Sequence, residues 1–135
     1  MPYESAKDGK HYWLTPPGLY KELDDEFNFD FDPCPYPQPL MFDGLEGDWG
    51  KSNYVNPPFK GPTRWVRKCI EQYRNGKKVV FVFPVDKWLL ELLKEGPEVR
   101  NLFDVKWHSI EENKPGKGIG RHIACFILDP NKQRR

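Results

Sequence analysis

The chain has few cysteines, no long apolar run and almost no net charge. Each of these absences restricts the class of protein to which the chain can belong. Cys34, Cys69 and Cys125 are far apart and form no C-x-x-C pair, which argues against a disulfide framework or a zinc site. No apolar run could span a membrane and there is no signal peptide, so we expect a soluble cytoplasmic protein without metal or membrane contact. A length of 135 residues, 38% of them hydrophobic, predicts one domain over residues 1–135.

The net charge of +1 is the sum of two unlike halves. Residues 1–50 contain 3 of the 21 Lys/Arg and 11 of the 20 Asp/Glu, so residues 51–135 contain the other 18 basic and 9 acidic residues. Such asymmetry is typical of a nucleic-acid surface on the basic half. The alternative is that the mixed charges only solvate helix faces, and charge alone leaves both interpretations open.

One stretch carries a specific chemistry. A short apolar run ends in Asn56-Pro57-Pro58-Phe59, and because proline cannot continue a sheet ladder, Asn56 should stand at the carboxyl end of a strand, where open α/β sheets bind ligands. The Asn56 side-chain oxygen and the Pro57 carbonyl could accept the two N–H hydrogens of an exocyclic base amine. Phe59 could stack on an extruded base. The alternative is a proline-rich turn with a buried Phe.

Hydrophobic periodicity predicts an α/β protein with a mostly parallel sheet and a C-terminal antiparallel hairpin at its edge. We expect a first helix that Thr15 caps. The expected helices cover about residues 16–27, 63–75 and 86–95, and the expected strands 27–31, 52–55, 79–83, 99–107 and 119–128. Residues 108–122 form a long glycine-rich loop, which is either functional or a mobile hairpin tip.

Four short motifs follow one another in a specific order: Trp13-x-Thr15-Pro16, Asp32-Pro33-Cys34, Asp43-Gly44-Leu45 with Trp49, and Asn56-Pro57-Pro58-Phe59. This order resembles the phage-type DNA N6-adenine methyltransferase family. The resemblance implies a class I methyltransferase fold, a Rossmann-like three-layer sandwich that binds S-adenosylmethionine. It implies a cofactor site of Tyr12, Thr15, Pro16, Asp32, Pro33, Asp43, Leu45 and Asn56, and a catalytic loop of Asn56, Pro57, Pro58 and Phe59.

The sequence also departs from the amino-methyltransferases at large. Prolines follow Asp32 where such enzymes usually have a glycine-rich loop whose N–H groups meet the cofactor carboxylate, and proline lacks that donor. Only 23 residues separate Asp32 from Asn56, an interval that normally contains two more strands, helices and an acidic ribose ligand. The resemblance therefore implies a trimmed fold.

The expected function is methylation of adenine N6 in double-stranded DNA, in the cytoplasm of a bacterial host and from a phage or prophage gene. Lys60, Arg64, Lys114, Lys117 and Arg121 are the expected phosphate contacts. No separate target-recognition domain is expected, and a homodimer is possible. Two alternatives remain open: a methyltransferase for RNA or a protein glutamine, and a nucleic-acid-binding module without catalysis.

Overall fold

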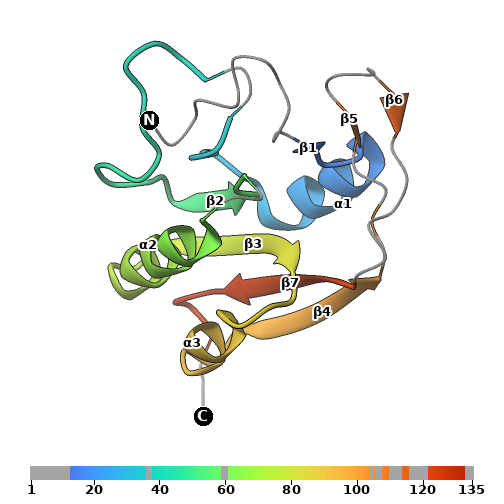
Figure 1. The fold of residues 1–135 in the computed structure, drawn as a ribbon. Helices are drawn as coiled ribbons and strands as arrows, with labels where there is room; N and C mark the ends of the chain where they lie inside the picture. Colours follow the sequence, from blue (N-terminus) through green and yellow to red (C-terminus); the bar gives the residue numbers. More distant parts are fainter. Residues whose placement is uncertain are drawn as a thin grey trace.

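A four-stranded mixed sheet forms the centre of the fold, in the order β2-β3-β7-β4 (Figure 1). The computed structural model describes residues 13–35, 38–58, 61–103, 105, 108–109, 114–115 and 122–132. Within them the strands are β1 (Trp13–Leu14), β2 (Ser52–Val55), β3 (Lys78–Pro84), β4 (Glu98–Phe103), β5 (His108–Ser109), β6 (Lys114–Pro115) and β7 (Ile123–Leu128). The helices are α1 (Pro17–Phe27), α2 (Pro62–Arg74) and α3 (Leu89–Leu93). The α/β class is thus confirmed.

The sheet is less parallel than predicted, because β7 is inserted between β3 and β4. β2 pairs with β3 in parallel, whereas β7 pairs antiparallel with both β3 and β4. The predicted antiparallel pairing of the last two long strands is confirmed, and the prediction of a mostly parallel sheet is wrong. β2, β3 and β4 nevertheless run in one direction, so their carboxyl ends lie at one edge of the sheet, which we call the carboxyl edge.

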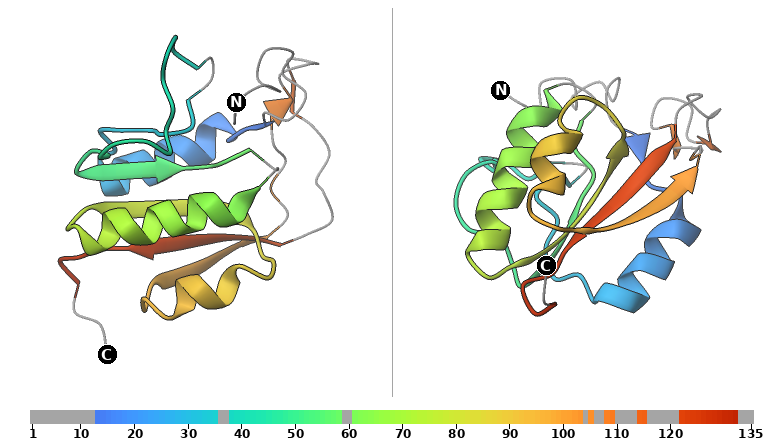
Figure 2. Two further views of the ribbon diagram at one scale, coloured as in Figure 1. Left: turned by 60° about the vertical axis from the view of Figure 1, so that its left-hand side comes forward. Right: turned by 90° about the horizontal axis from the view of Figure 1, so that it is seen from below.

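Helices cover both faces of the sheet and give the predicted three layers (Figure 2). Alternate residues of a strand point to opposite faces. Val79, Phe81 and Phe83 therefore pack with the α2 and α3 side chains in one apolar cluster, and Val80 and Val82 pack with those of α1 in another. No helix in the described part of the chain has the length and apolar character needed to cross a membrane.

The segment that follows α1 is not the predicted strand. Asn28 ends the helix in the left-handed conformation, with φ 51°, so the backbone turns where the strand was expected to begin. Only Phe31 pairs with β2, through a single parallel bridge to Asn53. The Asp30 carboxylate fixes this approach, since it accepts the N–H groups of Lys51 and Ser52 at 3.2 and 3.0 Å.

A second, small sheet has the order β1-β5-β6. β5 pairs antiparallel with β1 and with β6, so part of the glycine-rich loop lies beside the segment that leads into Thr15. Figure 1 shows this sheet on the same side of the molecule as the first turn of α1. The described part of the glycine-rich loop therefore pairs with the Trp13-x-Thr15-Pro16 motif. The sequence did not predict this pairing.

Candidate active site

Asn56 stands directly after β2, at the carboxyl edge, as the proline pair predicts. Asn56 is half-buried, and Pro57 and Pro58 are buried. The bridge between Phe31 and Asn53 is parallel, so the chain after Phe31 leaves the sheet in the same direction as the chain after β2. The Asp32 and Asn56 motifs consequently meet at one edge.

The side chains of Thr15, Tyr54 and Asn56 form a short hydrogen-bonded chain. Asn56 Nδ2 donates to Thr15 Oγ1 at 3.4 Å, and the Thr15 and Tyr54 hydroxyls are hydrogen-bonded to each other. This bond explains why Thr15 is not the N-cap of α1; Pro16 occupies that position, and no side chain caps the helix. The Thr15-Pro16 motif thus contacts the Asn56 motif directly.

Asp32 places a negative charge in a poorly solvated position. Part of the residue is exposed, but protein atoms surround its carboxyl group, and this burial raises its pKa to about 6 although the Cys34 N–H stabilises the ionised form. That N–H donates to Oδ1 at 2.8 Å. Among the described residues no cation forms an ion pair with Asp32. A cationic ligand would supply the missing counter-charge.

The turn at Asp43 packs tightly against the Asp32 motif. A Cβ atom added at Gly44 would lie 1.8 Å from the carbonyl oxygen of Pro33, so only glycine fits there. Asp43 Oδ1 accepts the Leu45 N–H at 2.9 Å, and the Gly44 carbonyl accepts Trp49 Nε1–H at 2.8 Å. Two motifs that are separate in the sequence are therefore held together, and a carboxylate has a second oxygen with which to accept a hydrogen bond from a ligand.

A model of the DNA N-6-adenine-methyltransferase (Dam) family matches residues 4–117. The chain belongs to this family. The match covers all four motifs and confirms the resemblance seen in the sequence. Comparisons with curated proteins and with solved structures gave no match.

A basic groove runs along α2 of this Dam-family chain. It has a volume of about 320 Å³ and is lined by Leu45, Arg64, Arg67, Lys68 and Glu71. The Arg64 guanidinium folds back toward Gly61, where an added Cβ would meet Nη2 at 3.3 Å. Gly61, the N-cap of α2, has a φ of 69°. The Arg64 side chain therefore lies beside the residue from which α2 begins.

Several predicted site residues of the Dam-family chain fall outside the part that the structure describes. They are Tyr12, Phe59, Lys60, Lys117 and Arg121. Lys114 is placed by its backbone, on β6. The described members of the predicted site are Thr15, Pro16, Asp32, Pro33, Asp43, Leu45, Asn56, Pro57, Pro58 and Arg64. Thr15, Asp32 and Asn56 meet at the carboxyl edge, while Leu45 and Arg64 line the groove on the α2 face.

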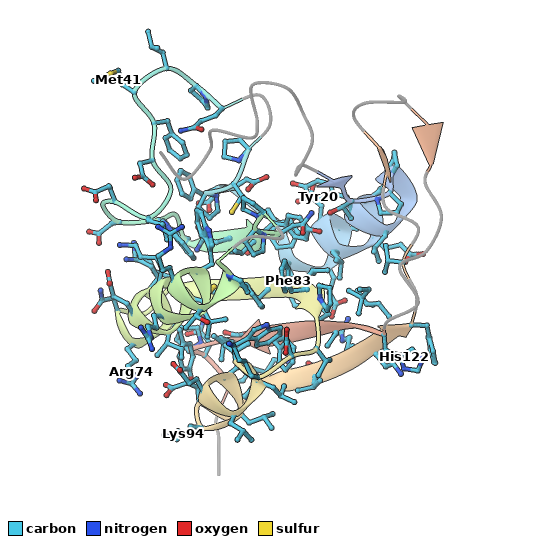
Figure 3. The ribbon with its side chains drawn as sticks, in the orientation of Figure 1. Tyr20, Met41, Arg74, Phe83, Lys94 and His122 are labelled. Atoms are coloured by element: carbon cyan, nitrogen blue, oxygen red, sulfur yellow. The ribbon has the colours of Figure 1, made fainter. Side chains whose placement is uncertain are left out.

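Two tyrosines belong to this region although the sequence analysis did not select them. Tyr54, on β2, is 3% exposed, and its ring meets that of Tyr20 edge-on, with centroids 5.0 Å apart. Tyr20 lies on α1 and is labelled in Figure 3. Burial raises the pKa of both hydroxyls, and the charge of Asp32 contributes to both shifts. The available signal was the spacing of Tyr54 and Asn56, since residues two apart share a strand face.

Proposed function

We propose that the chain is an S-adenosylmethionine-dependent DNA adenine N6-methyltransferase. The observation that carries the proposal is that, at one sheet edge, the Asn56-Pro57 acceptors stand near an Asp32 carboxylate that forms no ion pair with the described residues. A carboxylate suits a cationic cofactor, and two acceptors in series suit an amino group that has two hydrogens. Membership of the Dam family supports adenine in DNA as the substrate.

In the proposed reaction, the residues of the chain act mainly by positioning the target adenine. The Asn56 side-chain oxygen and the Pro57 carbonyl would accept the two N–H hydrogens of a flipped adenine, which favours a tetrahedral nitrogen with a free lone pair. The aromatic face of Phe59 would stack on the adenine. S-adenosylmethionine, when bound, supplies an electrophilic methyl group. The chain needs no general base, because the positively charged nitrogen product loses its proton to water, and preset acceptors stabilise that charge.

We further propose that the fold is a trimmed class I methyltransferase within a single domain. Three layers, three strands in one direction and one reversed strand support this assignment. In the described part of the interval between Asp32 and Asn56, β2 is the only helix or strand. Thr15, Pro16, Asp32, Pro33, Asp43, Leu45 and Asn56 would hold the cofactor, and a host cytoplasm would be the place of action.

The deciding experiment incubates the protein with duplex DNA and methyl-labelled S-adenosylmethionine, then sequences the DNA for N6-methyladenine. Label that appears at adenine N6 supports the proposal. Cofactor binding by calorimetry without transfer to DNA would instead favour a substrate of another class, such as RNA or a protein glutamine. Nucleic-acid binding without cofactor binding would favour the non-catalytic module.

Asp32 makes the stability of the cofactor-free protein depend on pH. Its pKa is about 6 in the folded protein against an ordinary value of 3.8, so the folded state holds its proton more tightly between these values. The contribution of Asp32 to the free energy of unfolding is fully present below about pH 4 and is lost as the pH rises through about 6. We expect the free energy of unfolding to fall by about 1–3 kcal/mol over this range, as measured by urea denaturation. Asp32→Asn should remove this component, and an unchanged pH profile in the variant would contradict the assignment.

The same group should make cofactor binding depend on pH in the opposite direction. Positive charges on the ligand favour ionised Asp32, so affinity for S-adenosylmethionine should increase by about tenfold between pH 5 and pH 7. Calorimetry at pH 6 in buffers of different ionisation enthalpy should detect proton release on binding. Asp32→Asn should bind more weakly and release no proton. Equal proton release by parent and variant would place the cationic part of the ligand elsewhere.

The basic groove gives a prediction about DNA. When basic side chains neutralise DNA phosphates, counterions are released from the DNA. Each neutralised phosphate contributes about 0.9 to the slope of log affinity against log salt concentration. Replacing Arg64 and Arg67 with Gln should therefore flatten this slope by about 1–2. Lys94→Gln, at the end of α3, is the matched control because it removes one charge away from the groove. A slope that changes only when Lys114, Lys117 and Arg121 are replaced would place the DNA on the loop instead.

A further inference from the structure

The amide of Asn56 contacts the Thr15 hydroxyl, and the partner of that hydroxyl decides whether it donates to the amide or accepts from it. Asn56 Nδ2 faces Thr15 Oγ1 at 3.4 Å, and Thr15 Oγ1 is hydrogen-bonded to the Tyr54 hydroxyl. Tyr54 lies on β2, and Asn56 directly follows that strand. The three side chains come from two segments separated by 39 residues at the Thr15–Tyr54 bond.

A hydroxyl has one hydrogen and can accept two hydrogen bonds, whereas an amide can present either its NH₂ or its oxygen. If the Thr15 hydrogen is given to Tyr54, Thr15 Oγ1 can only accept from Asn56. The NH₂ then turns toward Thr15, and Oδ1 turns away from it. If the Thr15 hydrogen is released, it can donate to Oδ1, and the amide can adopt the reverse orientation.

We propose that Tyr54 and Thr15 are positioning residues that hold the Asn56 amide in the orientation required for catalysis. Tyr54 accepts the Thr15 hydrogen, Thr15 accepts from Asn56 Nδ2, and Oδ1 is thereby directed to the hydrogen of the target amine. This inference rests on the proposed function, in which Oδ1 is that acceptor. It assigns Tyr54 a role that packing alone does not require, because a phenylalanine would fill the same space.

The surroundings of Tyr54 favour this direction of hydrogen bonding. The ring is 3% exposed and lies 5.0 Å from the Tyr20 ring and 5.2 Å from the Phe29 ring, between centroids, so the ring is held in place. Because Thr15 Oγ1 accepts a hydrogen bond from Asn56 Nδ2, the Thr15 hydrogen is available to donate to the Tyr54 oxygen.

The inference is tested with a double-mutant cycle on single-turnover methyl transfer. Tyr54→Phe should lower the rate at saturating S-adenosylmethionine by about tenfold, the equivalent of one hydrogen bond, and should leave the affinity for the cofactor unchanged. Thr15→Val should lower the rate at saturating cofactor by at least as much, and Thr15→Ser, which keeps the hydroxyl, should lower it less. In an Asn56→Asp background the two carboxylate oxygens are equivalent, so Tyr54→Phe should change the rate by less than about twofold. Equal losses in both backgrounds would show a structural role and overturn the inference.

A second measurement does not depend on catalysis. The side-chain NH₂ signals of Asn56 in an ¹⁵N NMR spectrum can be assigned by their loss in Asn56→Asp. Tyr54→Phe and Thr15→Val should both shift these signals and speed their exchange with water, whereas Thr15→Ser should leave them in place. Unchanged signals in Tyr54→Phe and Thr15→Val would overturn the inference. A parental chain that transfers no methyl group but shows these shifts would contradict the proposed function and leave the positioning network standing.

Discussion

Replacing Asn56 with alanine is expected to lower the single-turnover rate of methyl transfer to duplex DNA by about 100- to 1,000-fold. The change removes an acceptor that matters mainly when the amine nitrogen becomes tetrahedral and positively charged. It should therefore affect the rate much more than the affinity for S-adenosylmethionine. The rate is measured with labelled cofactor, and the affinity by calorimetry in parallel.

Two variants serve as controls for Asn56→Ala. Asn56→Asp keeps an acceptor oxygen in the same place and should retain activity. Asn75→Ala removes another asparagine side chain, at the C-cap of α2, and should leave the rate unchanged. If Asn56→Ala methylates DNA at the parental rate, the segment after β2 is a structural turn and the proposed active site is wrong.

Gly44→Ala is expected to have the largest effect on stability. The added methyl group would lie 1.8 Å from the Pro33 carbonyl oxygen and 2.9 Å from Pro33 Cβ. The nearest of these atoms belongs to the backbone, so a side-chain rotation cannot relieve the overlap. We expect the free energy of unfolding to fall by about 3 kcal/mol, as measured by urea denaturation. Affinity for S-adenosylmethionine should fall by about tenfold or more, because the Asp43 turn is displaced from Asp32.

Alanine substitutions at two other glycines distinguish the stability lost through steric overlap from the stability lost through an unfavourable backbone conformation. Gly18, in the first turn of α1, has no atom within 4 Å of an added Cβ, so Gly18→Ala should be neutral or stabilising by up to about 1 kcal/mol. Gly47 has equally open space but a φ of 73°, so Gly47→Ala should cost about 1 kcal/mol from the backbone alone. A Gly44→Ala variant as stable as Gly18→Ala would mean that the Asp43 turn and Pro33 separate in solution.

The helices and strands with strong periodicity could be predicted from the sequence, and their arrangement could not. The apolar stripe of α2 and the continuous apolar run of β3 gave both elements within two residues of their observed bounds. The predicted N-cap of α1 was wrong because Thr15 bonds Tyr54, which lies far away in the sequence. The position of β7 depends on pairings such as Val79 with Leu128, which local pattern does not encode.

The part of the candidate site that lies at the carboxyl ends of strands could be predicted from the sequence. Asn56 directly follows β2, and Asp32 follows Phe31, whose single parallel bridge to Asn53 directs both motifs toward one edge of the sheet. Tyr54 was not predicted, because an aromatic residue within a strand normally indicates core packing. The basic groove was not predicted either, because it forms only when Leu45 packs beside α2, and the residues between them contain no signal for that contact.

The internal position of β7 also determines when the protein can fold during its synthesis. β4 is joined to the sheet through β7 alone among the described strands, and β7 ends at Leu128. The ribosome therefore releases β3 and β4 before β7, the strand that connects them, has been made. Pairing over such long sequence separations is slow, and the nascent chain exposes the apolar faces of β3 and α2 in the meantime. The Asn56 loop is translated before β7, so the sheet that supports it is complete only after Leu128 has been made.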